Sequence, residues 1–115
     1  MSVKIYHNPK CSKSRATLAL LEERNVELEV VRYLETPLDA KEINGILKKL
    51  GLEPRDIMRK GEAAYKEQDL ADESLSRDAL IEAMAGEPIL IERPIVVNGD
   101  RARIGRPPES VLDIL

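Results

Sequence analysis

The order of strand-like and helix-like segments constrains the fold of this chain more than any other feature. Residues 3–6 begin by alternating apolar and polar side chains, as half-buried strands do. Residues 26–30 alternate again and begin a second strand, which should run to about residue 33. Between them, residues 12–25 carry Leu18 and Leu21 on one helical face. Parallel strands need a crossover connection such as a helix. The first part of the chain therefore predicts a β-α-β unit.

The last part of the chain predicts an antiparallel hairpin. Residues 95–97 and 101–104 are strand-like, and Asn98-Gly99 between them is a strong signal for a type I′ turn. The Pro-Pro-Glu segment at residues 107–109 predicts a final short helix. A parallel β-α-β half, joined through helices to a hairpin half, indicates an α/β fold with a mixed sheet of the thioredoxin-like type.

The middle of the chain predicts helices. Asp39 begins a variant capping box before an apolar helical pattern, and Gly51 is placed to end that helix. Ser76 predicts the N-cap of a further helix, which Gly86 and a following proline should end. Residues 53–75 carry no decisive pattern, although the proline near their start could open a short helix.

Length and composition fit a single compact domain over residues 1–115. The chain is 43% hydrophobic but contains no Trp or Phe, so its core must be aliphatic. Its net charge of -3 argues against a nucleic-acid or membrane-surface binder. No apolar stretch approaches the roughly 20 residues of a membrane span, and Lys4 interrupts the first apolar run. We therefore expect a cytoplasmic protein.

Cys11 is the only cysteine, which excludes an intramolecular disulfide and a cysteine-rich metal site, and we expect no metal at the site. It stands at a predicted helix start, with Lys10 and Lys13 beside it and Ser14 one helical turn further on. Helix N-termini and neighbouring cations lower a thiol pKa from its usual value of about 8.5. A buried structural cysteine would instead have apolar neighbours. The setting favours a reactive thiolate, and Ser14 could donate a hydrogen bond to the sulfur or to a bound anion.

The other candidate site residues are a histidine and three arginines. His7, the only histidine, could orient a neighbouring group or help to hold the thiolate, and it could equally be a hydrogen-bonded structural residue. Arg59, Arg93 and Arg106 stand in unusual local contexts, the last two directly before prolines. Guanidinium groups suit tetrahedral oxyanions because they donate bidentate, charge-assisted hydrogen bonds. Each of these arginines could also be a solvated surface residue.

Segments across the whole chain, in the same order, resemble the glutaredoxin-type arsenate reductases. These segments are residues 5–15, 33–37, 58–60, 88–97, 105–109 and 111–115. The family implies a thioredoxin-like fold with a helical insertion over about residues 37–86. It also implies reduction of arsenate to arsenite in arsenic detoxification, with no bound cofactor, glutathione as co-substrate and glutaredoxin as partner. The single cysteine fits this route, since a thioredoxin-coupled reductase would need resolving thiols.

The resemblance also implies roles for individual residues. Cys11 would be the nucleophile that attacks arsenate. Three arginines would line the oxyanion pocket: Arg59, Arg93 and Arg106. Two residues would tune the thiolate: His7 and Ser14. Pro94 would occupy the cis-proline position that thioredoxin-like folds place opposite the cysteine, although cis X-Pro bonds are uncommon.

The chain departs from the familiar arsenic-resistance enzymes in two places. Its cysteine loop reads Lys-Cys-Ser-Lys-Ser rather than Ala-Cys-Gly-Thr-Ser, and Gly105 stands where those enzymes can carry a further cysteine. Two other functions therefore stay open. One is a monothiol glutathione-linked oxidoreductase with another substrate. The other is a non-enzymatic regulator resembling Spx, which binds RNA polymerase but typically carries a Cys-x-x-Cys switch where this chain has Ser14.

Overall fold

The computed structural model describes residues 2–115. Its internal contacts divide the chain into two compact units. The first unit combines the N-terminal part, up to Thr36, with Arg93–Leu115, and the second unit is Pro37–Glu92. The expected helical insertion of about residues 37–86 falls within the second unit. A single domain over residues 1–115 stays a prediction.

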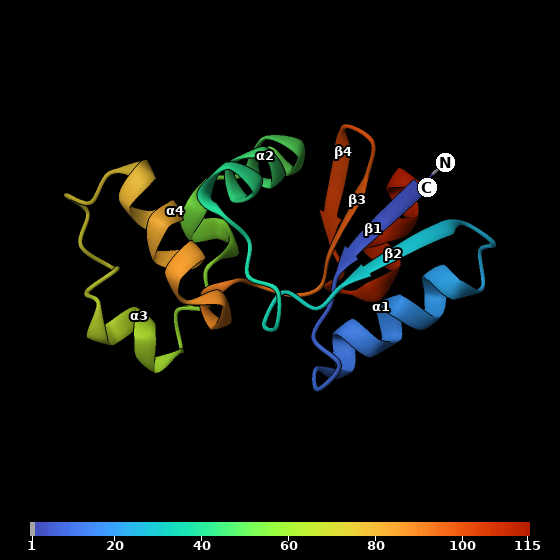
Figure 1. Ribbon diagram of the computed structural model, residues 1–115, viewed down its shortest axis with the longest axis horizontal. Coiled ribbons are helices and arrows are strands. Elements are labelled where there is room, and N and C mark those ends of the chain that lie inside the picture. Colours follow the sequence, from blue (N-terminus) through green and yellow to red (C-terminus); the bar gives the residue numbers. More distant parts are fainter. Residues whose placement is uncertain (1) are drawn as a thin grey trace. The chain divides into compact units, whose positions relative to one another are not determined.

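A four-stranded mixed sheet forms the first unit, in the order β2-β1-β3-β4 (Figure 1). The strands are β1 (Ser2–Tyr6), β2 (Glu27–Val31), β3 (Ile95–Asn98) and β4 (Arg101–Ile104). β1 pairs parallel with β2 and antiparallel with β3, and β3 pairs antiparallel with β4. This arrangement confirms the predicted α/β class, with a β-α-β half and a hairpin half in one thioredoxin-like sheet.

Two helices of the first unit, α1 (Ser12–Glu22) and the 3-10 helix η3 (Pro108–Ile114), pack together against the sheet. Their side chains and those of β1 and β3 form a core cluster in which each member is at most 1% exposed: Val3, Ile5, Leu21, Val96, Val111 and Ile114. Full burial of one such side chain contributes about 1.5–3 kcal/mol. Side chains alternate along a strand, so burial of Val3 and Ile5 on one face fixes the orientation of β1 and of the turn that follows it.

The hairpin turn differs from the predicted type I′ turn at Asn98-Gly99. Asn98 is the last residue of β3 and pairs with Arg101, so Gly99 and Asp100 form the two-residue turn. A type I′ turn needs positive φ at both central residues, but only Gly99 has it, at 65°. The Asn98 side chain is engaged elsewhere, since its Nδ2 donates to the Ile114 carbonyl at 2.5 Å. The predicted turn type is therefore wrong, although the hairpin itself is confirmed.

Two capped helices, α2 (Ala40–Leu50) and α4 (Arg77–Gly86), pack together in the second unit (Figure 1). The caps predicted from the sequence are confirmed. Asp39 and Ser76 begin the two helices, and each side chain accepts a hydrogen bond from a backbone N–H of the first turn. Gly51 ends α2 in the left-handed conformation, at φ 71°. These local signals mark the starts of both helices and the end of α2.

The segment without a decisive sequence pattern is held by Arg55. It contains the 3-10 helix η1 (Pro54–Ile57) and the short helix α3 (Ala63–Glu67). Arg55 Nε donates to the Leu70 carbonyl at 3.1 Å, and its Nη2 donates to the Asp72 carbonyl at 2.5 Å. These bonds attach the polar stretch after α3 to η1.

The helices of the described residues are short. The longest of them, α1 and α2, have 11 residues each, and the 3-10 helix η2 (Pro88–Leu90) has 3. Within residues 2–115, no helix is long and apolar enough to cross a membrane.

Candidate active site around Cys11

Cys11 lies at the N-terminus of α1, directly after the turn that follows β1. It is the N-cap residue, with an extended backbone at φ -97° and ψ 124°. Its N–H donates to the Asn8 carbonyl at 3.0 Å, and its carbonyl accepts the Arg15 N–H at 3.0 Å. The thiol is therefore placed at the end of the helix where backbone N–H groups have no partner within the helix. No acidic residue lies in the first turn of α1 to oppose a negative charge.

Asn8 shapes the turn that carries the cysteine, a role that the sequence analysis missed. Its side-chain Oδ1 accepts the Lys10 N–H, and its carbonyl accepts the Cys11 N–H, both at 3.0 Å. Asn8 is itself buried. A signal was present in the sequence, because an Asn before a Pro is typical of a turn in which the Asn side chain bonds to the following backbone.

The Ser14 hydroxyl fastens this turn to the helix. Ser14 Oγ accepts the Asn8 N–H at 3.0 Å and lies 2.6 Å from His7 Nδ1. Ser14 and His7 are both buried, and the His7 N–H donates to the Val31 carbonyl at 2.8 Å. The hydroxyl of Ser14 thus contacts the turn, while its backbone N–H is the group that acts on the Cys11 thiol.

Two opposing effects set the pKa of Cys11. Burial is the largest single effect and raises the pKa of the thiol. A hydrogen bond from the Ser14 N–H and the positive charge of Arg93 lower it, with smaller contributions from the Lys13 N–H and from a hydrogen bond of the Arg93 side chain. The net result is a pKa below the ordinary value of a thiol. This favours the thiolate, which is the nucleophilic form of cysteine.

Arg106 lies between the cysteine and the backbone of Arg93. Its Nη2 donates to Cys11 Sγ at 3.7 Å, and its Nε donates to the Arg93 carbonyl at 2.8 Å. The Arg93–Pro94 peptide bond is cis, as predicted, and the Arg106–Pro107 bond is also cis, which was not predicted. The structure therefore gathers six of the predicted site residues in the first unit: His7, Cys11, Ser14, Arg93, Pro94 and Arg106.

Arg59, the third predicted arginine, belongs to the second unit. Its Nη1 forms an ion pair with Glu62 Oε1 at 2.5 Å, and its backbone N–H donates to the Leu90 carbonyl at 2.7 Å. The guanidinium is partly buried beside Glu62. A role for Arg59 in oxyanion binding stays a prediction.

The surroundings of His7 disfavour the charged form of its imidazole ring. Burial lowers its pKa most, the charges of Arg32 and Arg15 lower it further, and Glu22 raises it slightly. The lowered pKa makes the charged form of the ring less available for holding the thiolate. Its contact with the Ser14 hydroxyl instead fits the other role expected of it, that of orienting a neighbouring group.

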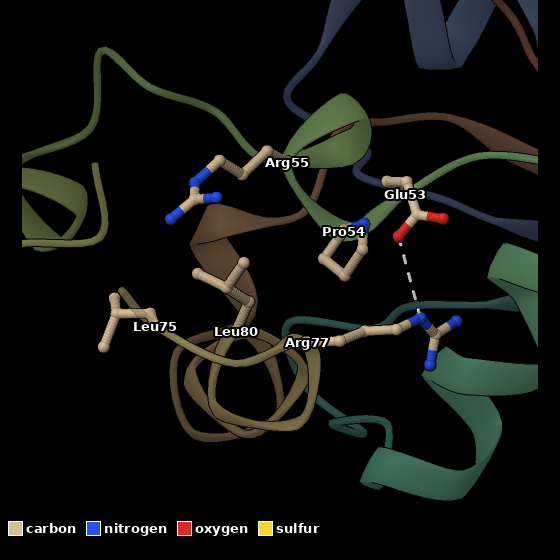
Figure 2. Close-up of a pocket in the computed structure, with 6 residues that line it drawn as sticks. All are labelled: Glu53, Pro54, Arg55, Leu75, Arg77 and Leu80. Carbon is tan, nitrogen blue, oxygen red and sulfur yellow. Dashed lines mark ion pairs between the residues drawn. The ribbon is translucent and has the colours of Figure 1, made fainter. Parts of the chain in front are cut away.

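A hollow in the second unit offers no comparable chemistry. A cavity of about 240 Å³ is lined by Glu53, Pro54, Arg55, Leu75, Arg77 and Leu80 (Figure 2). None of these residues is a thiol or hydroxyl nucleophile, and Arg77 Nε lies 3.8 Å from Glu53 Oε2. Within residues 2–115, no group of three or more His, Cys, Asp or Glu side chains could hold a metal ion.

Comparisons with known proteins support the family resemblance seen in the sequence. The ArsC family model matches residues 6–114. The uncharacterised protein YfgD of Escherichia coli (strain K12) is 61% identical over 114 residues, which cover 98% of this chain and 96% of YfgD. An arsenate reductase of Haemophilus influenzae is 50% identical over 116 residues, covering 100% of both chains. The solved structure of an arsenate reductase from Vibrio cholerae is 58% identical, with a TM-score of 0.97 over 100% of this chain and 98% of that one.

Replacing Arg93 with Ala is expected to raise the pKa of Cys11, because the charge and hydrogen bond of Arg93 favour the thiolate. The ultraviolet absorbance of the thiolate, followed against pH, measures this pKa directly. Arg103→Ala is a matched control, since Arg103 Nη1 bonds to the Ala102 carbonyl and does not act on the thiol. An unchanged pKa in Arg93→Ala would contradict this assignment.

Protonation of His7 is expected to destabilise the fold. Its pKa is lowered in the folded state, so the unfolded chain binds a proton more readily as the pH falls below about 6.5. The free energy of unfolding should therefore be fully retained above that pH and should decrease as the pH falls toward the folded-state pKa. Urea unfolding between about pH 7.5 and 5.5 measures this decrease. The same slope in His7→Gln would show that another group causes it.

Proposed function

Because the chain belongs to the ArsC family, we propose that it reduces arsenate to arsenite with the Cys11 thiolate as the nucleophile. One observation supports this most strongly: the Cys11 sulfur lies at the N-terminus of α1 and 3.7 Å from the Arg106 guanidinium. Positive groups that favour the thiolate also suit a tetrahedral oxyanion. The proposed nucleophile and a proposed oxyanion donor are therefore neighbours.

In the first step, the Cys11 thiolate attacks the arsenic(V) centre of arsenate. A sulfur–arsenic bond forms, and one arsenate oxygen takes up protons and leaves as water. Arg93 and Arg106 donate hydrogen bonds to the remaining oxygens, together with the backbone N–H groups at the start of α1. Donors fixed in advance stabilise the charge that develops on these oxygens without having to reorganise.

In the second step, the thiolate of glutathione attacks the Cys11 sulfur. A disulfide bond forms between the two sulfurs, and the sulfur–arsenic bond breaks with its electron pair remaining on arsenic. Arsenic(V) becomes arsenic(III) and leaves as arsenite, while the two thiols supply the two electrons. Cys11 is left as a mixed disulfide with glutathione.

Glutaredoxin then restores the enzyme. Its thiolate attacks the glutathione sulfur of the mixed disulfide, the bond to Cys11 breaks, and Cys11 leaves as a thiolate. A second glutathione regenerates glutaredoxin. An external thiol thus releases the only cysteine of the chain, and no resolving cysteine is required. This chemistry needs a reducing compartment, and we propose a cytoplasmic location for that reason.

Turnover in this proposal depends on Cys11 and Arg106. With arsenate, glutathione, glutaredoxin and glutathione reductase, the wild-type protein should oxidise NADPH, and Cys11→Ser should reduce the rate to background. Arg106→Ala should lower kcat/KM for arsenate by about 10²–10³-fold, the usual cost of losing one oxyanion donor. Arg103→Ala, which changes an arginine of β4 whose Nη1 donates to the neighbouring Ala102 carbonyl, should retain wild-type turnover.

Two results would reject parts of this account. Arsenate-dependent turnover by Cys11→Ser would remove Cys11 as the nucleophile. No turnover by wild-type protein whose Cys11 still alkylates rapidly at neutral pH would keep the thiolate but remove arsenate as the substrate. Turnover of glutathione mixed disulfides by that protein would then identify the monothiol oxidoreductase, and recovery of RNA polymerase subunits from a pull-down would identify the regulator.

A further inference from the structure

Gly105 differs from the other five of the chain's six glycines in the space around it. A Cβ atom on Gly105 would lie 2.5 Å from Thr17 Oγ1 and 2.8 Å from Pro94 Cγ, whereas nothing lies within 4 Å of a Cβ at the others. The positive φ angles of glycine occur only at Gly51 and Gly99. In this chain the close approach thus depends on the missing side chain of Gly105 and not on its backbone conformation.

The atoms that crowd this position cannot easily move. Thr17 is fully buried on α1, and its Oγ1 donates to the Lys13 carbonyl at 2.8 Å. A β-branched side chain in a helix has few alternative rotamers. The Pro94 ring is rigid, and the Pro94 carbonyl accepts the Gly105 N–H at 2.9 Å. A side chain at position 105 must therefore displace the backbone of residues 105–106.

This close approach brings together α1, which carries Cys11, and the end of β4, which leads into Arg106. Thr17 lies on α1, the helix that carries Cys11 at its N-terminus. Arg106 directly follows Gly105, and its guanidinium reaches both Cys11 Sγ and the Arg93 carbonyl. The separation between Gly105 and Thr17 thus sets how far the Arg106 backbone stands from the start of α1.

We propose that Gly105 is a positioning residue: its missing side chain lets the end of β4 rest on Thr17, and this contact sets the Arg106 guanidinium at the Cys11 sulfur. The effect of this positioning on catalysis rests on the proposed function, in which Arg106 is an oxyanion donor. The placement of positive charge beside the sulfur can be measured without arsenate.

The charge at the sulfur is measured by comparing two alkylating reagents, anionic iodoacetate and neutral iodoacetamide. The ratio of their rate constants with Cys11 cancels the thiolate fraction and reports the local positive potential. Gly105→Ala should lower this ratio by about threefold or more, and Arg106→Ala should lower it similarly. Gly105→Ala should leave the ratio unchanged in an Arg106→Ala background, because the positioned group is then absent.

Two further variants test the steric cause. Gly105→Ala combined with Thr17→Ala removes the closest contact and should recover at least half of the lost ratio on a logarithmic scale, but not all of it, because the Pro94 ring still crowds position 105. Gly45→Ala is the matched control, because a Cβ at Gly45 in α2 meets nothing within 4 Å, and it should retain the wild-type ratio. kcat/KM for arsenate should follow the ratio across the series.

A wild-type ratio of the two alkylation rate constants in folded Gly105→Ala overturns the inference. It is also overturned if Gly105→Ala lowers the ratio by the same factor in the Arg106→Ala background, or if the double variant recovers none of the lost ratio. If Gly105→Ala alone does not fold, the double variant is compared with Thr17→Ala. The Pro94 ring still crowds position 105 there, so a lower ratio supports the inference and an equal ratio overturns it. A normal alkylation series without arsenate turnover rejects the proposed function and leaves the positioning role standing.

Discussion

A thiol buried at the N-terminus of α1 is the constraint on which the rest of the site depends. Burial alone would keep Cys11 protonated, and the Ser14 N–H and the Arg93 charge must overcome that effect. A displacement that weakens either group would therefore raise the pKa of the thiol and lower the thiolate fraction. The turn before the helix must therefore be held firmly. The hydrogen bonds of Asn8 and Ser14 do this from within the same short stretch of chain.

The sheet brings the other half of the site to this turn. β3 pairs antiparallel with β1, so the chain enters β3 at the end of the sheet where β1 finishes, with Tyr6 opposite Ile95. Arg93 lies two residues before β3, and β4 returns the chain to the same end before Arg106. The strand pairing thus explains how Arg106 reaches Cys11 across a separation of 95 positions. The catalytic chemistry that we propose needs both the thiol on the turn after β1 and the arginines that flank β3 and β4.

Local features could be predicted from the sequence, and long-range contacts could not. The helix caps at Asp39 and Ser76 depend only on neighbouring residues, and the strand and helix order follows from periodicity. The predicted helix start and the neighbouring lysines indicate Cys11 from the sequence itself. The shared oxyanion role of Arg59, Arg93 and Arg106 followed from the family resemblance, since no spacing rule relates arginines far apart in sequence to one cysteine. The attachment of residues 70–72 to Arg55 and the approach of Gly105 to Thr17 depend on the folded backbone, so only the structure reveals them.

The central claim is that Cys11 forms a bond to arsenic and then a disulfide with glutathione. A rapid-quench single turnover with arsenate and glutathione, without glutaredoxin, tests it most directly. Mass spectrometry of the peptide that contains Cys11 and assay of arsenite follow the same samples. The account predicts a Cys11–glutathione disulfide that appears only with arsenate and in step with one arsenite per chain. Arsenite formation with Cys11 unmodified, or an equal yield of the disulfide without arsenate, would contradict it.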